Sequence, residues 1–79
     1  MMKPETNHEM GALERRVRVA MLTALGLRSI AKLAERIDVS PDRLYRWVRV
    51  GAGLSLDEMR RLAATLDLTV AELVGEEAA

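Results

Sequence analysis

A twelve-residue pattern that occurs twice in this chain limits the folds open to it more than any other feature. The pattern, L-A-x-x-[IL]-D-[VL]-[ST]-x-x-x-L, begins at Leu33 and recurs 29 residues later at Leu62. Each copy describes a tight corner between two helices. The alanine permits close packing, the Asp turns the chain, and the Ser or Thr caps the next helix. Two copies are too few for a solenoid, so we expect a small helical bundle.

Helical spacing and capping residues divide the chain into five expected helices. Apolar residues recur at intervals of three and four, which is the period of an amphipathic helix. Ser or Thr precedes three of the five segments and begins a fourth, where Ser55-Leu56-Asp57-Glu58 has the capping-box pattern. The expected helices span residues 9–25, 30–37, 41–50, 55–66 and 70–74. The expected fold class is therefore all-α, a compact five-helix bundle.

The apolar stripes of these segments predict the core. Trp47 lies on such a stripe, so we expect it in the core rather than stacked on a nucleic-acid base. The other expected core positions are Met10, Leu13, Val17, Met21, Ala24, Leu25, Leu33, Ala34, Ile37, Leu44, Val48, Met59, Leu62, Ala63 and Leu66. The opposite face of residues 41–50 is left exposed.

The composition argues against several kinds of site. The chain has no Cys and one His, His8, so we expect no disulfide and no zinc site built from Cys and His. It has no glycine-rich phosphate loop and no carboxylate pair that the sequence brings together. We therefore expect neither an enzyme nor a bound cofactor or metal. No small-molecule effector is indicated either.

The ends of the chain differ from its middle. Residues 1–8 lack helical periodicity and are expected to be a flexible leader, with an ordered arm around a ligand or partner as the alternative. Residues 9–75 are expected to form one domain, followed by a short acidic tail at 76–79. No apolar run approaches 18 residues, and the first ten residues lack a signal-peptide core. A cytoplasmic protein without membrane contact is expected.

The first corner, at residues 33–44, resembles the helix-turn-helix of DNA-binding repressors. The packed positions of that motif are occupied by Leu33, Ala34, Val39, Leu44 and Trp47. From residue 29 to residue 73, without a gap, the chain is similar to the phage-repressor-like (Cro/C1, Xre) family. The resemblance implies a lambda-repressor-like bundle with its helix-turn-helix at residues 30–50. In that motif, residues 41–50 enter the major groove of double-stranded DNA.

The resemblance also implies which side chains touch DNA. The face of residues 41–50 that is not buried supplies the candidates for base contacts: Arg46, Arg43, Tyr45, Asp42 and Pro41. Arg46 is the best candidate for a bidentate contact to guanine. Arg43 is a candidate for base or phosphate contact, and Asp42 can instead be a favourable charge at a helix start. The candidates for phosphate contacts are Ser29, Lys32, Arg28, Arg49 and Ser40.

This chain departs from the family pattern in ways that leave a second interpretation open. The family usually has glycine at both corners, where this chain has Asp38 and Asp67. It often has glutamine where this chain has Ile30, which cannot donate a hydrogen bond to DNA. Pro41 and Asp42 are unusual readers of phosphate or guanine. The alternative is a helical protein-interaction module, adaptor or antitoxin-like, that lacks specific DNA reading.

The resemblance further implies a homodimer on a pseudo-palindromic site, with half-sites about one helical turn apart. No separate oligomerisation segment is evident, so we expect the bundle surface to supply the contact. Val70, Val74 and Leu54 are the candidates, with core packing as their alternative.

Charge is unevenly distributed along the chain although its formal net charge is zero. Residues 13–50 carry nine basic and four acidic side chains, a net charge of +5. Residues 1–12 carry a net charge of −1, and residues 51–79 a net charge of −4. DNA would attract the basic part and repel the acidic part. We expect the C-terminal helices to point away from the phosphates or toward a second subunit.

Overall fold

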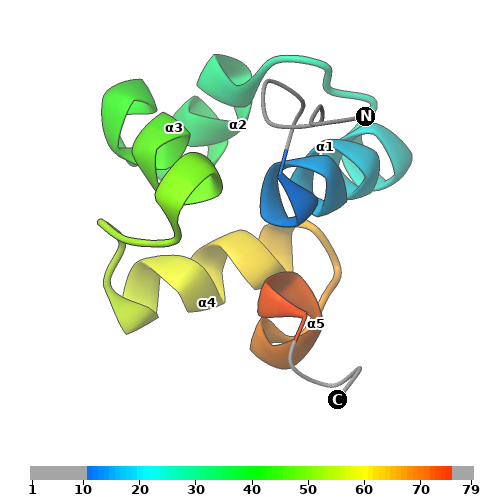
Figure 1. Ribbon diagram of the computed structural model, residues 1–79. Helices are drawn as coiled ribbons and strands as arrows, with labels where there is room; N and C mark the ends of the chain where they lie inside the picture. Colours follow the sequence, from blue (N-terminus) through cyan, green and yellow to red (C-terminus); the bar gives the residue numbers. More distant parts are fainter. Residues whose placement is uncertain (1–10, 76–79) are drawn as a thin grey trace, which may run out of the picture.

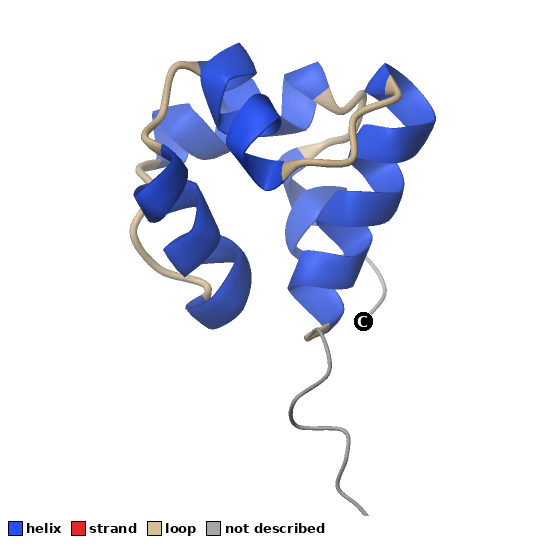
Figure 2. Ribbon diagram, turned by 90° about the horizontal axis from the view of Figure 1, so that it is seen from above, coloured by secondary structure: helices blue, strands red, loops and turns tan. Residues whose placement is uncertain are grey.

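The helices begin and end at the residues that the sequence supplies for that purpose. The structure is a computed structural model that describes residues 11–75, and these form five helices joined by short turns (Figure 1). The helices are α1 (Ala12–Leu25), α2 (Ile30–Ile37), α3 (Pro41–Val50), α4 (Leu56–Thr65) and α5 (Val70–Val74). No strand occurs within the described range (Figure 2). The predicted all-α class is confirmed.

Side-chain caps fix the starts of four helices. The hydroxyls of Ser29 and Ser40 accept hydrogen bonds from the third backbone N–H of α2 and of α3, at 3.3 and 3.2 Å. The capping box predicted at Ser55 is present, because Glu58 also accepts a hydrogen bond from the Ser55 N–H at 2.9 Å. Thr69 forms a second capping box at the start of α5. These contacts satisfy N–H groups that lack partners within the helix.

The first helix starts later than predicted. The apolar spacing predicts a start at residue 9, whereas α1 begins at Ala12 after an extended Gly11. Glycine is unfavourable inside a helix and acceptable before its first turn, which explains the shift. Residues 9 and 10 lie outside the described range. Ala24, predicted in the core, is exposed.

The two copies of the repeated pattern form equivalent corners. Asp38 and Asp67 both adopt the left-handed conformation, with φ of 60° and 62°. The residue after each Asp donates a backbone hydrogen bond to the alanine carbonyl of its own copy, at 3.0 and 2.8 Å. This is the Schellman arrangement that commonly ends a helix at glycine. The predicted turns are confirmed, with Asp in the position that usually favours glycine.

A single core joins all five helices. Its buried residues are Val17, Met21, Ile30, Leu33, Ala34, Ile37, Val39, Leu44, Trp47, Val48, Leu62, Ala63, Leu66 and Leu73. No polar or charged side chain is buried among the described residues. Leu44 and Leu73, the last residues of the two repeated patterns, are both fully buried. Burial of apolar surface, rather than internal polar contacts, holds the helices together.

The helices are arranged so that one corner stays accessible. The α2 and α3 helices pack against each other, α4 lies beneath them, and α5 lies against α1 and α4 (Figure 1). Arg16 of α1 donates a hydrogen bond to the Leu73 carbonyl at 3.1 Å, which satisfies a carbonyl at the end of α5. In this arrangement the outer face of α3 is not covered by any of the other four helices. Among residues 11–75, no helix is both long and apolar enough to cross a bilayer.

Candidate nucleic-acid interface

The α3 helix has one buried and one exposed face, divided as the sequence predicted. Its inward face consists of Leu44, Trp47 and Val48, all buried in the core. Its outward face carries the five candidates for base contacts, and all of them are exposed: Pro41, Asp42, Arg43, Tyr45 and Arg46. An α-helix with such a face has the width and shape that the major groove admits.

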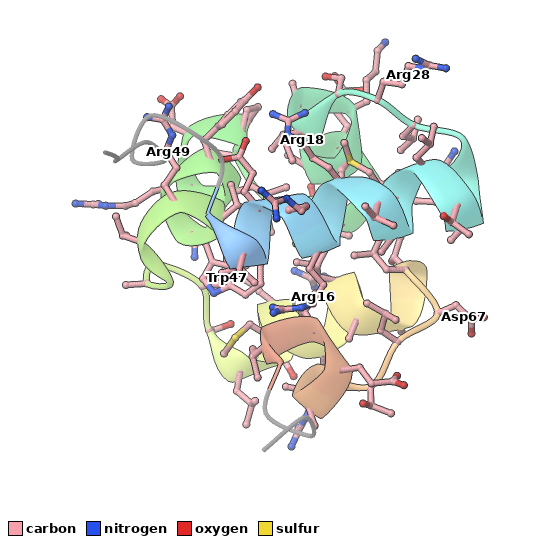
Figure 3. All side chains as sticks on the ribbon, turned by 45° about the vertical axis from the view of Figure 1, so that its right-hand side comes forward. Arg16, Arg18, Arg28, Trp47, Arg49 and Asp67 are labelled. Atoms are coloured by element: carbon pink, nitrogen blue, oxygen red, sulfur yellow. The ribbon has the colours of Figure 1, made fainter. Side chains whose placement is uncertain are left out.

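Four of the five candidates for phosphate contacts lie around the starts of α2 and α3, and the fifth, Arg49, lies in the last turn of α3. Arg28 and Lys32 are exposed before and within the first turn of α2, and Arg49 is exposed on α3. Figure 3 shows Arg28 at the outer edge of the molecule, remote from the Asp67 corner. The hydroxyl oxygens of Ser29 and Ser40 already accept hydrogen bonds as caps. Each hydroxyl still has its own hydrogen to donate to a phosphate.

Ile30 takes no part in this surface. It is the first residue of α2, and its side chain is fully buried. It lies on one stripe with Leu33, Ala34 and Ile37, and this spacing is visible in the sequence. The isoleucine side chain therefore contributes to the core and not to a surface that could contact DNA. Any contact between the start of α2 and phosphate must come from backbone N–H groups and the flanking basic side chains.

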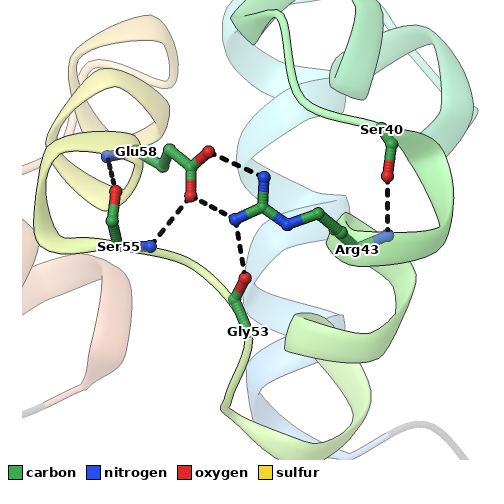
Figure 4. Close-up of polar contacts among 5 residues, drawn as sticks. All are labelled: Ser40, Arg43, Gly53, Ser55 and Glu58. Carbon is green, nitrogen blue, oxygen red and sulfur yellow. Dashed lines mark hydrogen bonds and ion pairs between the residues drawn. The ribbon is translucent and has the colours of Figure 1, made fainter.

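Arg43 is exposed, but its guanidinium group is bonded to neighbouring parts of the protein across the surface (Figure 4). Its Nη1 donates a hydrogen bond to Glu58 Oε2 at 2.9 Å, and its Nη2 donates to Glu58 Oε1 at 2.6 Å. Nη2 also donates to the Gly53 carbonyl at 2.9 Å. The guanidinium group therefore joins α3 to the loop before α4 and to the first turn of α4. No feature of the sequence connects position 43 with position 58.

Glu58 is the fixed partner of this ion pair. Its carboxylate also caps α4, and only 16% of its side chain is exposed, against 48% for Arg43. The hydrogen bonds from Arg43, and next the one from the Ser55 backbone, lower the pKa of Glu58 to about 2. The same ion pair raises the pKa of Arg43. Both groups are charged at neutral pH, so their charges largely cancel at this edge of α3.

Arg46 lies one turn further along α3 and is arranged differently. It takes part in neither of the ion pairs found among residues 11–75. A methyl group placed on Gly53 would lie 3.6 Å from Arg46 Cδ, so the arginine stem passes close to this glycine. Gly53 has a φ of +113°, which a residue with a side chain rarely adopts. The loop therefore lies against both arginines, but it forms a hydrogen bond only with Arg43.

Two further arginines stabilise the scaffold behind α2 and α3. Arg18 pairs with Glu14 one turn earlier in α1 at 3.0 Å, and it donates a longer hydrogen bond of 3.4 Å to the Arg28 carbonyl. Arg16 lies beside α5 (Figure 3). Arg18 thus connects α1 to the segment that leads into α2, and Arg16 connects α1 to α5.

The candidates for the dimer contact are partly buried. Leu54, Val70 and Val74 all pack against the core. The large apolar side chains that are exposed lie elsewhere: Val19, Leu22, Tyr45, Val50 and Leu56. Val19 lines an open groove of about 760 Å³ between α1 and the α4–α5 corner.

Within residues 11–75, no three His, Cys, Asp or Glu side chains are grouped so that they could hold a metal ion.

Comparison with known proteins adds a family to this geometry. Residues 20–78, well over half of the chain, match the model of the Cro/C1-type HTH DNA-binding domain. No curated protein and no solved structure matches the chain. The matched segment contains both corners, the exposed face of α3 and the loop that holds Arg43. The chain therefore belongs to the Cro/C1-type helix-turn-helix family of DNA-binding domains.

Proposed function

We propose that this domain is a sequence-specific transcriptional regulator that reads the major groove of double-stranded DNA with α3 and acts as a repressor. The observation that carries the proposal is the exposed face of α3, where Arg46, Tyr45 and Asp42 lie opposite the buried Leu44 and Trp47. Arg46 is the proposed reader, through a bidentate contact to guanine O6 and N7. A domain bound in the major groove blocks the access of other proteins to that site, which favours a role as a repressor.

Phosphate contacts are proposed to set the register of α3 on the duplex. Lys32 and Arg28 flank the start of α2, where unpaired backbone N–H groups and the helix dipole favour an anion. Arg49 and the hydroxyls of Ser29 and Ser40 are the other proposed contacts. Such contacts fix orientation without distinguishing sequences.

The distribution of charge supports one orientation on DNA. The segment with a net charge of +5, residues 13–50, includes α2 and α3. The segment with a net charge of −4, residues 51–79, includes α4 and α5. We propose that α5 points away from the phosphates. We further propose that Val70, Val74 and Leu54, which are only partly buried, contribute to the contact of a homodimer on a pseudo-palindromic site.

Selection of bound duplexes from a random pool tests this proposal. We expect an enriched sequence that contains guanine at a fixed position and recurs in two inverted half-sites about 10 base pairs apart. An enriched single half-site would reject the dimer and keep the reading of bases. A pool without enrichment would reject sequence-specific reading.

A protein-interaction module on the same scaffold is the second candidate. The groove between α1 and the α4–α5 corner favours it, because Val19 remains 59% exposed there. Affinity for a random duplex, measured across a salt series, separates the two. A protein that makes several phosphate contacts loses affinity steeply as salt rises, with a log–log slope of about −0.9 per contact. An interaction module that lacks DNA contacts would show no binding even at low salt.

A further inference from the structure

Two arginines share the outward face of α3, and they differ in the contacts that their side chains make. Arg43 and Arg46 are three residues apart, so both lie on one side of the helix. Arg43 is bonded to Glu58 and to the Gly53 carbonyl, whereas Arg46 is in neither ion pair of the described residues. The sequence alone makes Arg46 the best candidate for a base contact and leaves Arg43 as a candidate for either base or phosphate contact, but it does not show that Arg43 is bonded within the protein.

The contact with Glu58 uses the part of Arg43 that would recognise guanine. A bidentate contact to guanine O6 and N7 needs two N–H groups of the guanidinium in a fork. In Arg43 both terminal nitrogens donate to the two carboxylate oxygens of Glu58, at 2.9 and 2.6 Å. Nη2 makes a further contact to the Gly53 carbonyl. Arg43 cannot offer that fork to DNA without leaving Glu58.

Glu58 holds this arginine from a fixed position. Its Oε1 accepts from the Ser55 N–H at 2.9 Å and from Arg43 at the same time. The capping box therefore sets the carboxylate at the first turn of α4, and Arg43 reaches across from α3 (Figure 4). Only 16% of the Glu58 side chain is exposed, which agrees with a carboxylate held by several partners.

We propose that Glu58 withholds Arg43 from DNA, which makes Arg43 a positioning residue between α3 and α4 and Arg46 the arginine that reads bases. This inference rests on the proposed function, because it concerns which side chains of α3 reach the duplex. It assigns Glu58 a role in specificity although Glu58 does not touch DNA. Loss of its charge would add a second arginine to the reading face.

The variant Glu58→Gln weakens the hold on Arg43 with little change to the helix start, because the amide is uncharged and offers one acceptor oxygen in place of two. Glutamine is accepted at this position of a capping box, so α4 should keep its cap. The matched control is Asp57→Asn, which removes the same charge from the same helix turn, at an exposed residue that is in neither ion pair of the described residues. Urea unfolding of each variant establishes that it is folded at the temperature of the binding assay.

Base preference and salt dependence are then measured for five proteins on the duplex selected by the wild type and on its single-base variants. The proteins are wild type, Arg43→Ala, Glu58→Gln, Asp57→Asn and the double variant Arg43→Ala/Glu58→Gln. We expect Arg43→Ala and Asp57→Asn to keep the wild-type order of sites and its salt slope, with affinity within about fivefold. We expect Glu58→Gln to change the order of sites and to steepen the slope by about 0.9. The double variant should return both quantities to the wild-type values, because the released arginine is then absent.

Two results would overturn the inference while leaving the proposed function intact. The first is a changed base preference in Arg43→Ala with Glu58 in place, since that identifies Arg43 as a reader. The second is a Glu58→Gln protein that behaves like Asp57→Asn. A wild type that prefers no duplex at all would instead reject the proposed function, and the inference with it.

Discussion

Asp38 and Asp67 occupy equivalent positions in two helix–helix corners that have the same geometry. Both adopt the left-handed conformation, with φ of 60° and 62°. The equivalence extends to the residues around them. Val39 and Leu68 donate to the carbonyls of Ala34 and Ala63, and Ser40 and Thr69 cap the helices that follow. One short pattern is therefore used for two turns, of which only the first leads into the exposed helix α3.

The Asp corners predict a gain in stability from glycine. Left-handed backbone costs an L-residue about 1–2 kcal/mol, less for Asp than for most residues and nothing for glycine. We expect Asp38→Gly to raise the free energy of unfolding by up to about 1 kcal/mol, and Asp67→Gly to do the same. Asp38→Ala, which keeps the strain and removes the polar group, should lower it. Urea denaturation measures all three; a loss of stability in Asp38→Gly would show that the carboxylate itself stabilises the corner.

The last leucine of each repeated pattern should be equally important for folding. Leu44 and Leu73 are fully buried, so truncation to alanine removes buried surface and leaves a cavity. We expect a loss of about 2–5 kcal/mol for each, enough to unfold much of so small a domain. Leu56→Ala is the control, because that leucine is 51% exposed and should change stability by less than about 0.5 kcal/mol. A Leu73→Ala protein as stable as the control would contradict a single shared core.

The corners could be predicted from sequence because the interactions that make them are local. A cap, a left-handed Asp and the leucine that packs back all lie within twelve residues of chain. The capping box at Ser55 was predicted for the same reason. The burial of Ile30 is predictable for the same reason, because its spacing to Leu33 and Ile37 is helical.

The ion pair between Arg43 and Glu58 could not be predicted in this way. The two residues are 15 positions apart, and between their helices runs a loop in which Gly53 takes a φ of +113° and accepts a hydrogen bond from the same arginine. The sequence predicts Arg43 as a candidate for base contact and Glu58 as part of a helix cap. It does not show that the two side chains meet, because the path of the loop between them depends on the packing of the helices on either side.

The low pKa of Glu58 predicts an acid-sensitive contribution to stability. Because its pKa falls from 4.5 to about 2 on folding, the charged form is favoured in the folded state. The ion pair therefore contributes its full stability above about pH 4.5, and that contribution is lost as pH falls toward 2. Glu58→Gln should show a smaller loss of stability than the wild type over this range. Urea unfolding at several pH values measures the difference, with Asp57→Asn as the control; parallel curves for the wild type and Glu58→Gln would contradict the pKa.

Lys32 should affect all DNA sequences alike. It is proposed to contact phosphate, so Lys32→Ala should weaken binding to preferred and random duplexes by the same factor and reduce the salt slope by about one. Arg61→Ala is the control, since Arg61 is an exposed cation on α4, in the part of the chain proposed to face away from DNA. Fluorescence anisotropy at several salt concentrations gives both quantities. An Arg61→Ala protein that lost as much affinity would contradict the proposed orientation.

Arg46 carries the central claim that α3 reads bases. The direct measurement compares the affinity of the wild type and of Arg46→Ala for the selected duplex and for the same duplex with the guanine replaced. The wild type should discriminate between them by about 1–3 kcal/mol, and Arg46→Ala should bind both alike. Discrimination that survives in Arg46→Ala would contradict the claim.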